Sequence, residues 1–143
     1  MSAVTVRRAR LEEVRPLAAE YLAEQDEAFG RPTSPPLPQG GVFWVAEDGE
    51  GAVVGYAAGT LRPEGCTIGP IFTRRTGRRQ GVAGALLAAI ETWATDTRLP
   101  LLEVAVNADN TDGVAFLAAS GYRPGTVLMV PTATLGDGHA AGA

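Results

Sequence analysis

The chain has 143 residues and a formal net charge of −4; apolar residues make up 45% of it and charged residues 20%. This composition is typical of one globular domain, and the acidic balance argues against a nucleic-acid binder. No apolar run reaches the roughly 18 residues of a membrane span, and the N-terminus lacks the apolar core of a signal peptide, so we expect a cytoplasmic protein with no membrane partner.

The first half of the chain predicts a strand, a helix, a loop and a hairpin. Alternation of apolar and polar residues indicates a strand at 4–7, and apolar positions at helical spacing indicate a helix at about 11–25. Four prolines between residues 30 and 41 favour a loop. Residues 42–46 form a strand, and residues 47–51, with two glycines, form the turn of a hairpin.

The second half predicts strands and helices in alternation. The hairpin returns at 52–61, and a further strand runs over 66–73, where Gly69-Pro70 indicates a bulge or a break because proline cannot donate to a ladder. The remaining predicted elements are, in order, a helix at 81–97, a strand at 101–106, a helix at 110–120 closed by Gly121, and a strand at 122–130.

This order of elements predicts an α+β sandwich around one mixed sheet. We expect a single domain over residues 1–130 and a flexible Gly/Ala-rich tail over residues 131–143. Cys66 is the only cysteine, which excludes an internal disulfide and a multi-thiolate metal site. His139, the only histidine, lies in the tail, so we expect neither a catalytic triad nor a metal centre.

The segment before the helix at 81–97 is the main candidate for chemistry. Four arginines fall within six residues there: Arg74, Arg75, Arg78 and Arg79. The first turn of a helix has free N–H groups and carries about half a positive charge, and the small residues that follow the arginines allow a phosphate to come close. The pattern predicts an anion site of the kind that holds a pyrophosphate. The alternative is an ordinary turn with solvated arginines.

The segment is neither a Walker A motif, because no Gly-Lys-Ser/Thr follows, nor a dinucleotide fingerprint, because the third glycine is absent. Arg78-x-x-Gly81-x-Ala83 instead matches the R/Q-x-x-G-x-G/A signature of the GCN5-related N-acetyltransferase (GNAT) family. Residues 106–110 and 116–123 resemble that family's second signature. The resemblance extends over about residues 3–130.

The resemblance implies a GNAT-like α+β fold: a mixed, mostly antiparallel sheet of six to seven strands, flanked by helices, with splayed central strands. Gly69-Pro70 would help to end the strand pairing and open that gap, or it is an edge-strand proline without a role. The resemblance also implies acetyl-CoA as cosubstrate. The implied coenzyme-binding residues are Ile71, Phe72, Thr73, Arg78, Arg79, Gln80, Gly81, Val82, Ala83, Gly84 and Asn110.

Within this set, the backbone of residues 71–73 would bind the pantetheine arm, and an N–H of Phe72 or Thr73 would polarise the thioester carbonyl. The amides of residues 79–84 would hold the pyrophosphate. Asn110 resembles the family asparagine that approaches the coenzyme arm, and a helix N-cap is an equally good interpretation.

The implied activity is acyl-CoA-dependent N-acyl transfer, most simply of an acetyl group, by direct attack of an amine. Many relatives have a tyrosine seven residues after the asparagine that protonates the leaving thiolate, and Leu117 stands there in this chain. In one reading solvent protonates the thiolate. In a second reading the hydroxyl of Ser120, Tyr56 or Tyr122 takes the place of the missing tyrosine. In the third reading the chain is a non-catalytic acyl-CoA-binding sensor or regulatory module.

A general base is equally open. Ala105 occupies the position where some relatives have a glutamate, and Glu103 nearby is a weak candidate. No catalytic residue is therefore assigned. The acidic stretch from Glu12 to Glu27 is either a solvated helix face or a rim of the acceptor site that favours a cationic amine. Expected partners are a small-molecule or peptide amine and, as in many relatives, a second copy in a homodimer.

Overall fold

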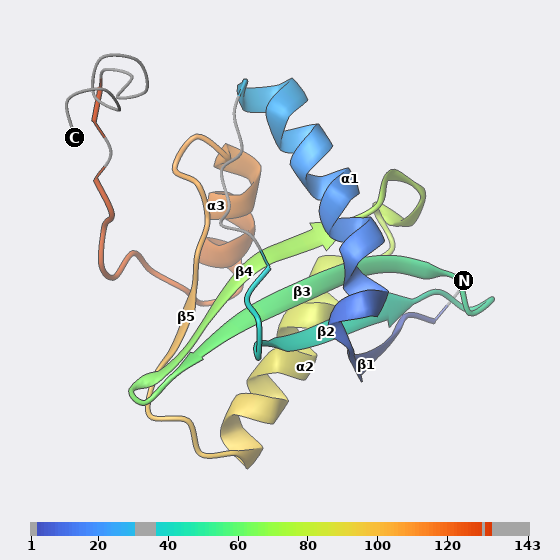
Figure 1. Ribbon diagram of the computed structural model, residues 1–143, viewed down its shortest axis with the longest axis horizontal. Helices are drawn as coiled ribbons and strands as arrows, with labels where there is room; N and C mark the ends of the chain where they lie inside the picture. The colour runs from blue at the N-terminus through green and yellow to red at the C-terminus, as the bar shows by residue number, and fades with distance from the viewer. Residues whose placement is uncertain (1–2, 31–36, 130, 133–143) are drawn as a thin grey trace. The chain divides into compact units, whose positions relative to one another are not determined.

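The computed structural model describes residues 3–30, 37–129 and 131–132. The chain forms two compact units, Met1–Asn110 and Thr111–Ala143. The elements of the first unit are, in order, β1 (Thr5–Ala9), α1 (Leu11–Phe29), β2 (Val42–Glu47), β3 (Val53–Arg62), β4 (Gly65–Thr73), the 3-10 turn η1 (Arg75–Gly77), α2 (Val82–Asp96) and β5 (Leu102–Val104) (Figure 1). The second unit holds α3 (Thr111–Ala119).

The five strands form one mixed sheet in the order β1-β2-β3-β4-β5. The first three strand pairs are antiparallel, and β4 and β5 are parallel. The α+β class and the mixed sheet are as predicted, but the expected number of six to seven strands is wrong. The predicted strand at 122–130 is absent over its described residues, 122–129, because Pro124-Gly125 interrupts the run and no strand pairs with the exposed apolar residues that follow.

Strand β4 has a bulge at the predicted place. It carries one residue more than β3 between the pairs Ala57↔Ile71 and Gly59↔Ile68, and the extra residue falls at Gly69-Pro70. Pairing of β4 with β5 ends on the same spot: the last paired residues are Ile68 and Val104, followed by a hydrogen bond from the Ala105 N–H to the Ile68 carbonyl (2.7 Å). Within the described residues, the rest of β4 therefore pairs only with β3.

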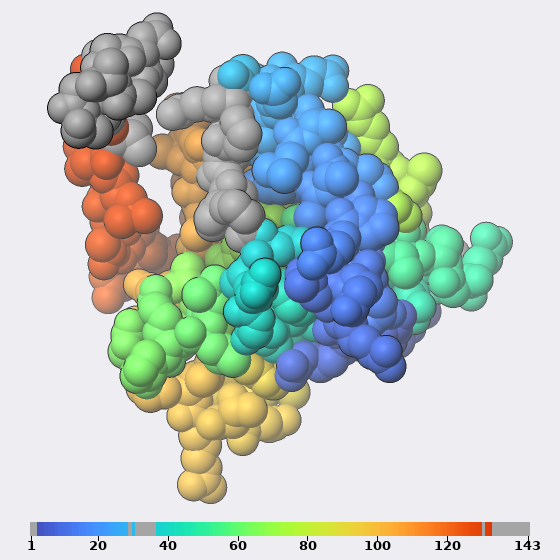
Figure 2. All heavy atoms as spheres, in the orientation of Figure 1, coloured from blue at the N-terminus to red at the C-terminus, as the bar shows by residue number. Residues whose placement is uncertain are grey.

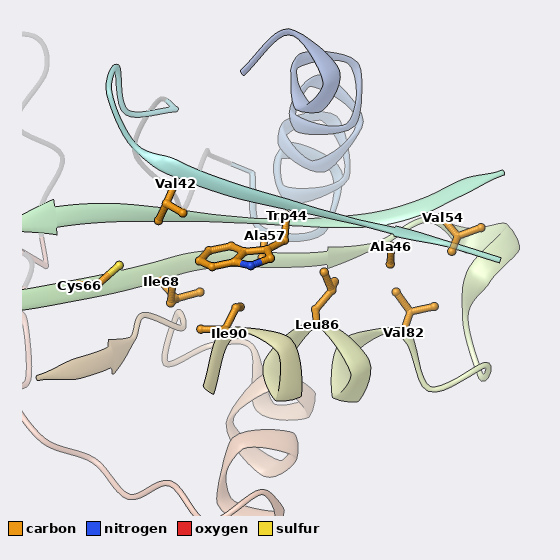
Figure 3. Packing of buried hydrophobic residues seen from close by; sticks show 10 residues of the cluster. All are labelled: Val42, Trp44, Ala46, Val54, Ala57, Cys66, Ile68, Val82, Leu86 and Ile90. Carbon is orange, nitrogen blue, oxygen red and sulfur yellow. The ribbon is translucent and has the colours of Figure 1, made fainter. Parts of the chain in front are cut away.

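The two helices of the first unit cover opposite faces of the sheet (Figure 1). Helix α2 presents Val82, Leu86 and Ile90 to the cluster that includes Trp44 and Ile68, as Figure 3 shows. This is the apolar face that the helical spacing predicts. Helix α1 packs Val14, Leu17 and Ala18 on the other face, against a cluster that includes Phe43, Tyr56 and Phe72.

Local sequence accounts for where the elements end. Glu13 accepts the Arg10 N–H at the start of α1 (2.8 Å), and Gly30, with φ 72°, ends that helix. Asp48 accepts the N–H groups of Glu50 and Ala52 (2.9 and 3.0 Å) and so closes the predicted hairpin turn.

In the second unit, Gly121 (φ 94°) follows α3, and the Tyr122 N–H donates to the Leu117 carbonyl (2.9 Å), so Gly121 closes the helix as predicted. Residues 31–36 of the predicted loop, and residues 133–143 of the predicted tail with His139, lie outside the described residues.

Candidate functional site

The backbone from Arg79 to Gly84, which includes the first turn of α2, forms a run of free donors. Arg79 and Gly81 both have positive φ angles, 67° and 76°, and α2 begins directly after them. The first helical bond at this end runs from the Ala85 N–H to the Gly81 carbonyl (3.0 Å). No acceptor in the described chain takes the N–H groups of residues 79–84. Six consecutive donors at a helix N-terminus are an arrangement that binds an anion.

The surface in front of these donors is open. A Cβ atom added at Gly81 or at Gly84 would meet no protein atom within 4 Å. Arg79 and Gln80 are exposed, and Ala83 is half-buried. Val82 is buried in the core, so only its backbone can meet a ligand. A phosphate group can therefore reach the amides without displacing a side chain.

Close packing under the segment holds it on the sheet. A Cβ atom at Gly77 would lie 2.6 Å from Cβ of Val54, and one at Gly55 would lie 2.7 Å from both the Phe72 carbonyl oxygen and Cγ1 of Val82. Only glycine allows the backbones to come this near. The start of α2 is thereby fixed next to the end of β4.

The last residues of β4 have one free edge. Arg74 donates its N–H to the carbonyl of Val54 (2.8 Å), its directly opposed residue in the register that pairs Gly55 with Thr73. Hydrogen-bonded and non-hydrogen-bonded pairs alternate along an antiparallel ladder. We infer that the backbone groups of Phe72 face β3, whereas those of Ile71 and Thr73 face the edge that β5 leaves open.

Side chains on the α1 face of the sheet form an aromatic group beside this edge. The Phe72 ring makes edge-to-face contacts with Tyr21 and Tyr56, at centroid distances of 5.5 and 6.0 Å. Burial, and to a lesser degree the neighbouring Tyr21, raises the pKa of Tyr56 well above its usual value. Tyr56 is only 1% exposed. It therefore keeps its proton at neutral pH.

The arginines of the segment are mostly engaged with α1. Arg74 binds both carboxylate oxygens of Glu20 (3.0, 3.0 and 2.5 Å), and Arg78 donates from Nη2 to Glu24 (2.5 Å). Arg75 makes longer contacts of 3.8 Å with Glu24 and Glu27. Figure 2 shows the atoms of this segment lying beside those of α1.

These pairs were not predicted from the sequence, although the spacing of Glu20, Glu24 and Glu27 places them along one helix face. Arg79 differs from the other three arginines, since it has no ion pair within the described residues. It is the cation of the segment that α1 leaves available for a ligand.

Several other candidates are tied to structural partners. Glu103 accepts hydrogen bonds from Arg62 (2.8 Å) and Thr67 (3.3 Å), which makes it a poor general base. The Ser120 hydroxyl donates to the Phe116 carbonyl one turn earlier (2.8 Å).

Asn110 directly precedes α3, and its N–H donates to the Asn107 carbonyl (2.9 Å). Leu117 is the buried residue of α3. Burial raises the pKa of the Cys66 thiol, so Cys66 is a small core residue and not a reactive thiolate.

Three further features bear on function. No group of three or more potential metal ligands occurs in the described part of the chain, and no helix there is long and apolar enough to cross a membrane. A surface hollow lies at the start of α1. It is lined by Arg7, Arg8, Ala9, Arg10, Glu12 and Glu13.

Known folds resemble this one closely. A ribosomal-protein-alanine N-acetyltransferase from Brucella melitensis biovar Abortus 2308 superposes with a TM-score of 0.71 at 19% identity, covering 90% of this chain and 99% of the other. A possible acetyltransferase from Clostridium difficile 630 gives 0.69 at 14%, covering 92% and 97%. An aminoglycoside N-acetyltransferase in complex with coenzyme A gives 0.65 at 18%, covering 93% and 96%.

No curated protein matches the chain in sequence. The model of the acetyltransferase (GNAT) family matches residues 9–122. That match includes the free amides before α2, the open edge of β4 and all of α3. The chain belongs to the acetyltransferase (GNAT) family.

Proposed function

We propose that the protein is an acyl-CoA-dependent N-acyltransferase that moves an acetyl group from acetyl-CoA to an amine. The observation that carries the proposal is the run of six free amides from Arg79 to Gly84 at the start of α2, together with the free edge of β4, the strand that precedes this helix. A pyrophosphate needs the first feature, and an extended amide-containing arm needs the second. Family membership supports the same coenzyme.

In this proposal the coenzyme lies along the open edge of β4. The pyrophosphate accepts hydrogen bonds from the amides of residues 79–84, and the pantetheine arm pairs with the outward backbone groups of Ile71 and Thr73. Of the two N–H groups expected to polarise the thioester carbonyl, that of Thr73 faces the open edge whereas that of Phe72 faces β3; the outward N–H of Ile71, which lies farther along β4 from the pyrophosphate, is the second candidate donor. Asn110 remains a candidate contact for the arm on the resemblance of its motif alone.

The reaction is direct transfer. A neutral amine attacks the thioester carbon, the carbonyl π electrons move to oxygen, and the collapse of the tetrahedral intermediate expels the coenzyme thiolate. The amine loses one proton and the thiolate gains one. A thiol is a far stronger acid than an alcohol (a cysteine thiol has a pKa near 8.5), so a thiolate is a tolerable leaving group, and solvent can supply that proton although Leu117 stands at the position of the usual tyrosine. Proximity and orientation supply much of the rate.

The second candidate function is a non-catalytic acyl-CoA sensor, and Leu117 is the observation that favours it. It shares the coenzyme site with the enzyme and lacks turnover. For the enzyme, a peptide amine and a small-molecule amine are both candidate acceptors. By their names, two proteins of similar fold act on a ribosomal-protein alanine and on an aminoglycoside, so the fold is compatible with both a peptide and a small-molecule amine. Homodimer formation and a cytoplasmic location remain predictions.

A measurement of turnover distinguishes the acyltransferase from the non-catalytic sensor. The purified chain is incubated with acetyl-CoA and, in separate reactions, an aminoglycoside, free amino acids, a peptide with an N-terminal alanine and a peptide with an internal lysine. Free coenzyme thiol is followed by absorbance and the acetylated amine by mass spectrometry. The enzyme predicts thiol release that depends on one class of amine and matches the product formed. Tight coenzyme binding with no amine-dependent release indicates the sensor, and absence of coenzyme binding refutes both.

A further inference from the structure

Helix α1 and the segment before α2 are joined by a ladder of ion pairs between residues far apart in sequence. Glu20, Glu24 and Glu27 follow one another at intervals of four and three residues, which places them on one face of α1. They meet Arg74, Arg78 and Arg75 respectively. The contacts to Arg74 and Arg78 are 2.5 Å, whereas the contact between Glu27 and Arg75 is 3.8 Å.

The two short pairs fix the two ends of the segment 74–78. Arg74 binds Glu20 and also donates from Nη1 to the Val53 carbonyl (3.0 Å). Arg78 binds Glu24 and donates from Nε to the Thr73 carbonyl (3.2 Å). Each guanidinium therefore links α1 to the backbone of the sheet. The free amides begin at the very next residue after Arg78.

We propose that Glu24 is a positioning residue for the coenzyme: by holding Arg78 against the Thr73 carbonyl, it fixes the backbone from which the amides of residues 79–84 project, and so sets the affinity for the coenzyme phosphates. The inference rests on the proposed function, since it names what holds that same site in place. It assigns Arg78 to the support of the site and leaves Arg79, which alone among the four arginines at positions 74–79 has no ion pair within the described residues, to meet the phosphates.

The opposite role, in which Glu24 keeps Arg78 away from the coenzyme, fits the contacts less well. Arg78 uses Nε and Nη2 for its two partners and keeps its other donors. The Thr73 carbonyl accepts one hydrogen bond from Arg78 and has a second lone pair for the pantetheine arm. Neither contact has to break when a coenzyme binds. The Glu24 side chain is 26% exposed against 76% for Glu27, so it is also the more firmly held of the two acids.

A double-mutant cycle distinguishes the two roles of Glu24, because loss of its charge weakens acetyl-CoA binding if Glu24 positions the site and tightens it if Glu24 keeps Arg78 away from the coenzyme. Dissociation constants for acetyl-CoA are measured by calorimetry for the wild type, Glu24→Gln, Arg78→Gln and the double variant. Glu27→Gln is the matched control, because it removes the same charge from the same helix face without touching Arg78. Urea unfolding of each variant establishes that it is folded under the assay conditions.

If Glu24 positions the site, Glu24→Gln and Arg78→Gln each weaken acetyl-CoA binding by about 5-fold, the effect expected from losing one partly exposed, charge-assisted contact. The double variant is then no weaker than either single variant, and Glu27→Gln changes the constant by less than about twofold. Tighter or unchanged binding by Glu24→Gln, or full additivity in the double variant, overturns the proposal.

A second measurement does not need the coenzyme. The heteronuclear ¹⁵N NOE of residues 78–81 reports backbone motion in the free protein. It falls in Glu24→Gln and stays at the wild-type value in Glu27→Gln if Glu24 holds the segment. Equal values in both variants overturn the inference even where coenzyme binding itself is confirmed. If the wild-type protein binds no acetyl-CoA, the proposed function itself is refuted, and that result is known before any variant is compared.

Discussion

A substitution at Gly84 can raise the stability of the free protein and at the same time lower its affinity for an anion. It is the third residue of α2, it has no positive φ, and an added Cβ atom meets nothing within 4 Å. In Gly84→Asp, the higher helix propensity and the favourable charge at the helix N-terminus together add about 0.5–1 kcal/mol to the free energy of unfolding.

The same carboxylate lies beside the free amides, where the pyrophosphate is proposed to bind. At about 7 Å from a phosphate charge, a screened carboxylate repels it by about 1–2 kcal/mol, which raises the dissociation constant for acetyl-CoA by about 5- to 30-fold. Gly84→Ala is the neutral control: it should gain about the same stability from helix propensity and keep the wild-type affinity. Gly84→Asn adds the shape of the side chain without its charge.

Urea unfolding followed by circular dichroism gives the stability, and calorimetric titration gives the dissociation constant. If Gly84→Asp is folded and binds acetyl-CoA as tightly as Gly84→Ala, the pyrophosphate does not lie at these amides. A variant that loses stability would contradict the helix geometry on which the estimate depends.

Three further predictions concern the fold that carries the site. Arg98 follows α2 with φ 56°, so Arg98→Gly should raise the free energy of unfolding by about 1 kcal/mol, and urea unfolding without a gain would contradict that backbone assignment. Gly55→Ala forces a Cβ atom to 2.7 Å from the Phe72 carbonyl and should cost about 2–3 kcal/mol in the same assay; a variant as stable as the wild type would show that the strands are not this close. Tyr56 has a raised pKa in the folded state, so its contribution to stability is present below the unfolded pKa of about 10 and is lost as the pH rises above it. The free energy of unfolding of Tyr56→Phe should therefore fall less steeply with pH between about pH 8 and pH 11 than that of the wild type. An identical fall in both proteins would contradict the burial of the Tyr56 hydroxyl.

Features that depend on neighbouring residues were predictable from the sequence. The spacing of Val82, Leu86 and Ile90 predicted the buried face of α2, because helical periodicity is local. Proline's missing N–H predicted the irregularity of β4 at Gly69-Pro70. The free amides before α2 follow from the helix start and from Gly81, both of which are local as well.

Features that depend on distant partners were not predictable in the same way. The apolar run at 126–130 has the composition of a strand, but a strand forms only where another strand pairs with it, and composition does not identify that partner. Glu24 and Arg78 are 54 residues apart, so their ion pair could not be read from spacing along either segment. Both the arginine cluster and the acidic cluster were visible in the sequence. Only the three-dimensional structure shows that the two clusters form ion pairs with each other.

The most direct test of the central claim is to map the coenzyme on ¹⁵N-labelled protein. Acetyl-CoA is titrated into the wild-type chain while amide chemical shifts are recorded. We expect the largest changes on the amides of residues 79–84 and on Ile71 and Thr73, whereas residues 7–10, 12 and 13, which line the hollow at the start of α1, stay unchanged. Changes centred on residues 7–10, 12 and 13 with residues 79–84 unmoved would contradict this prediction, and the amides of residues 79–84 would then not be the coenzyme site.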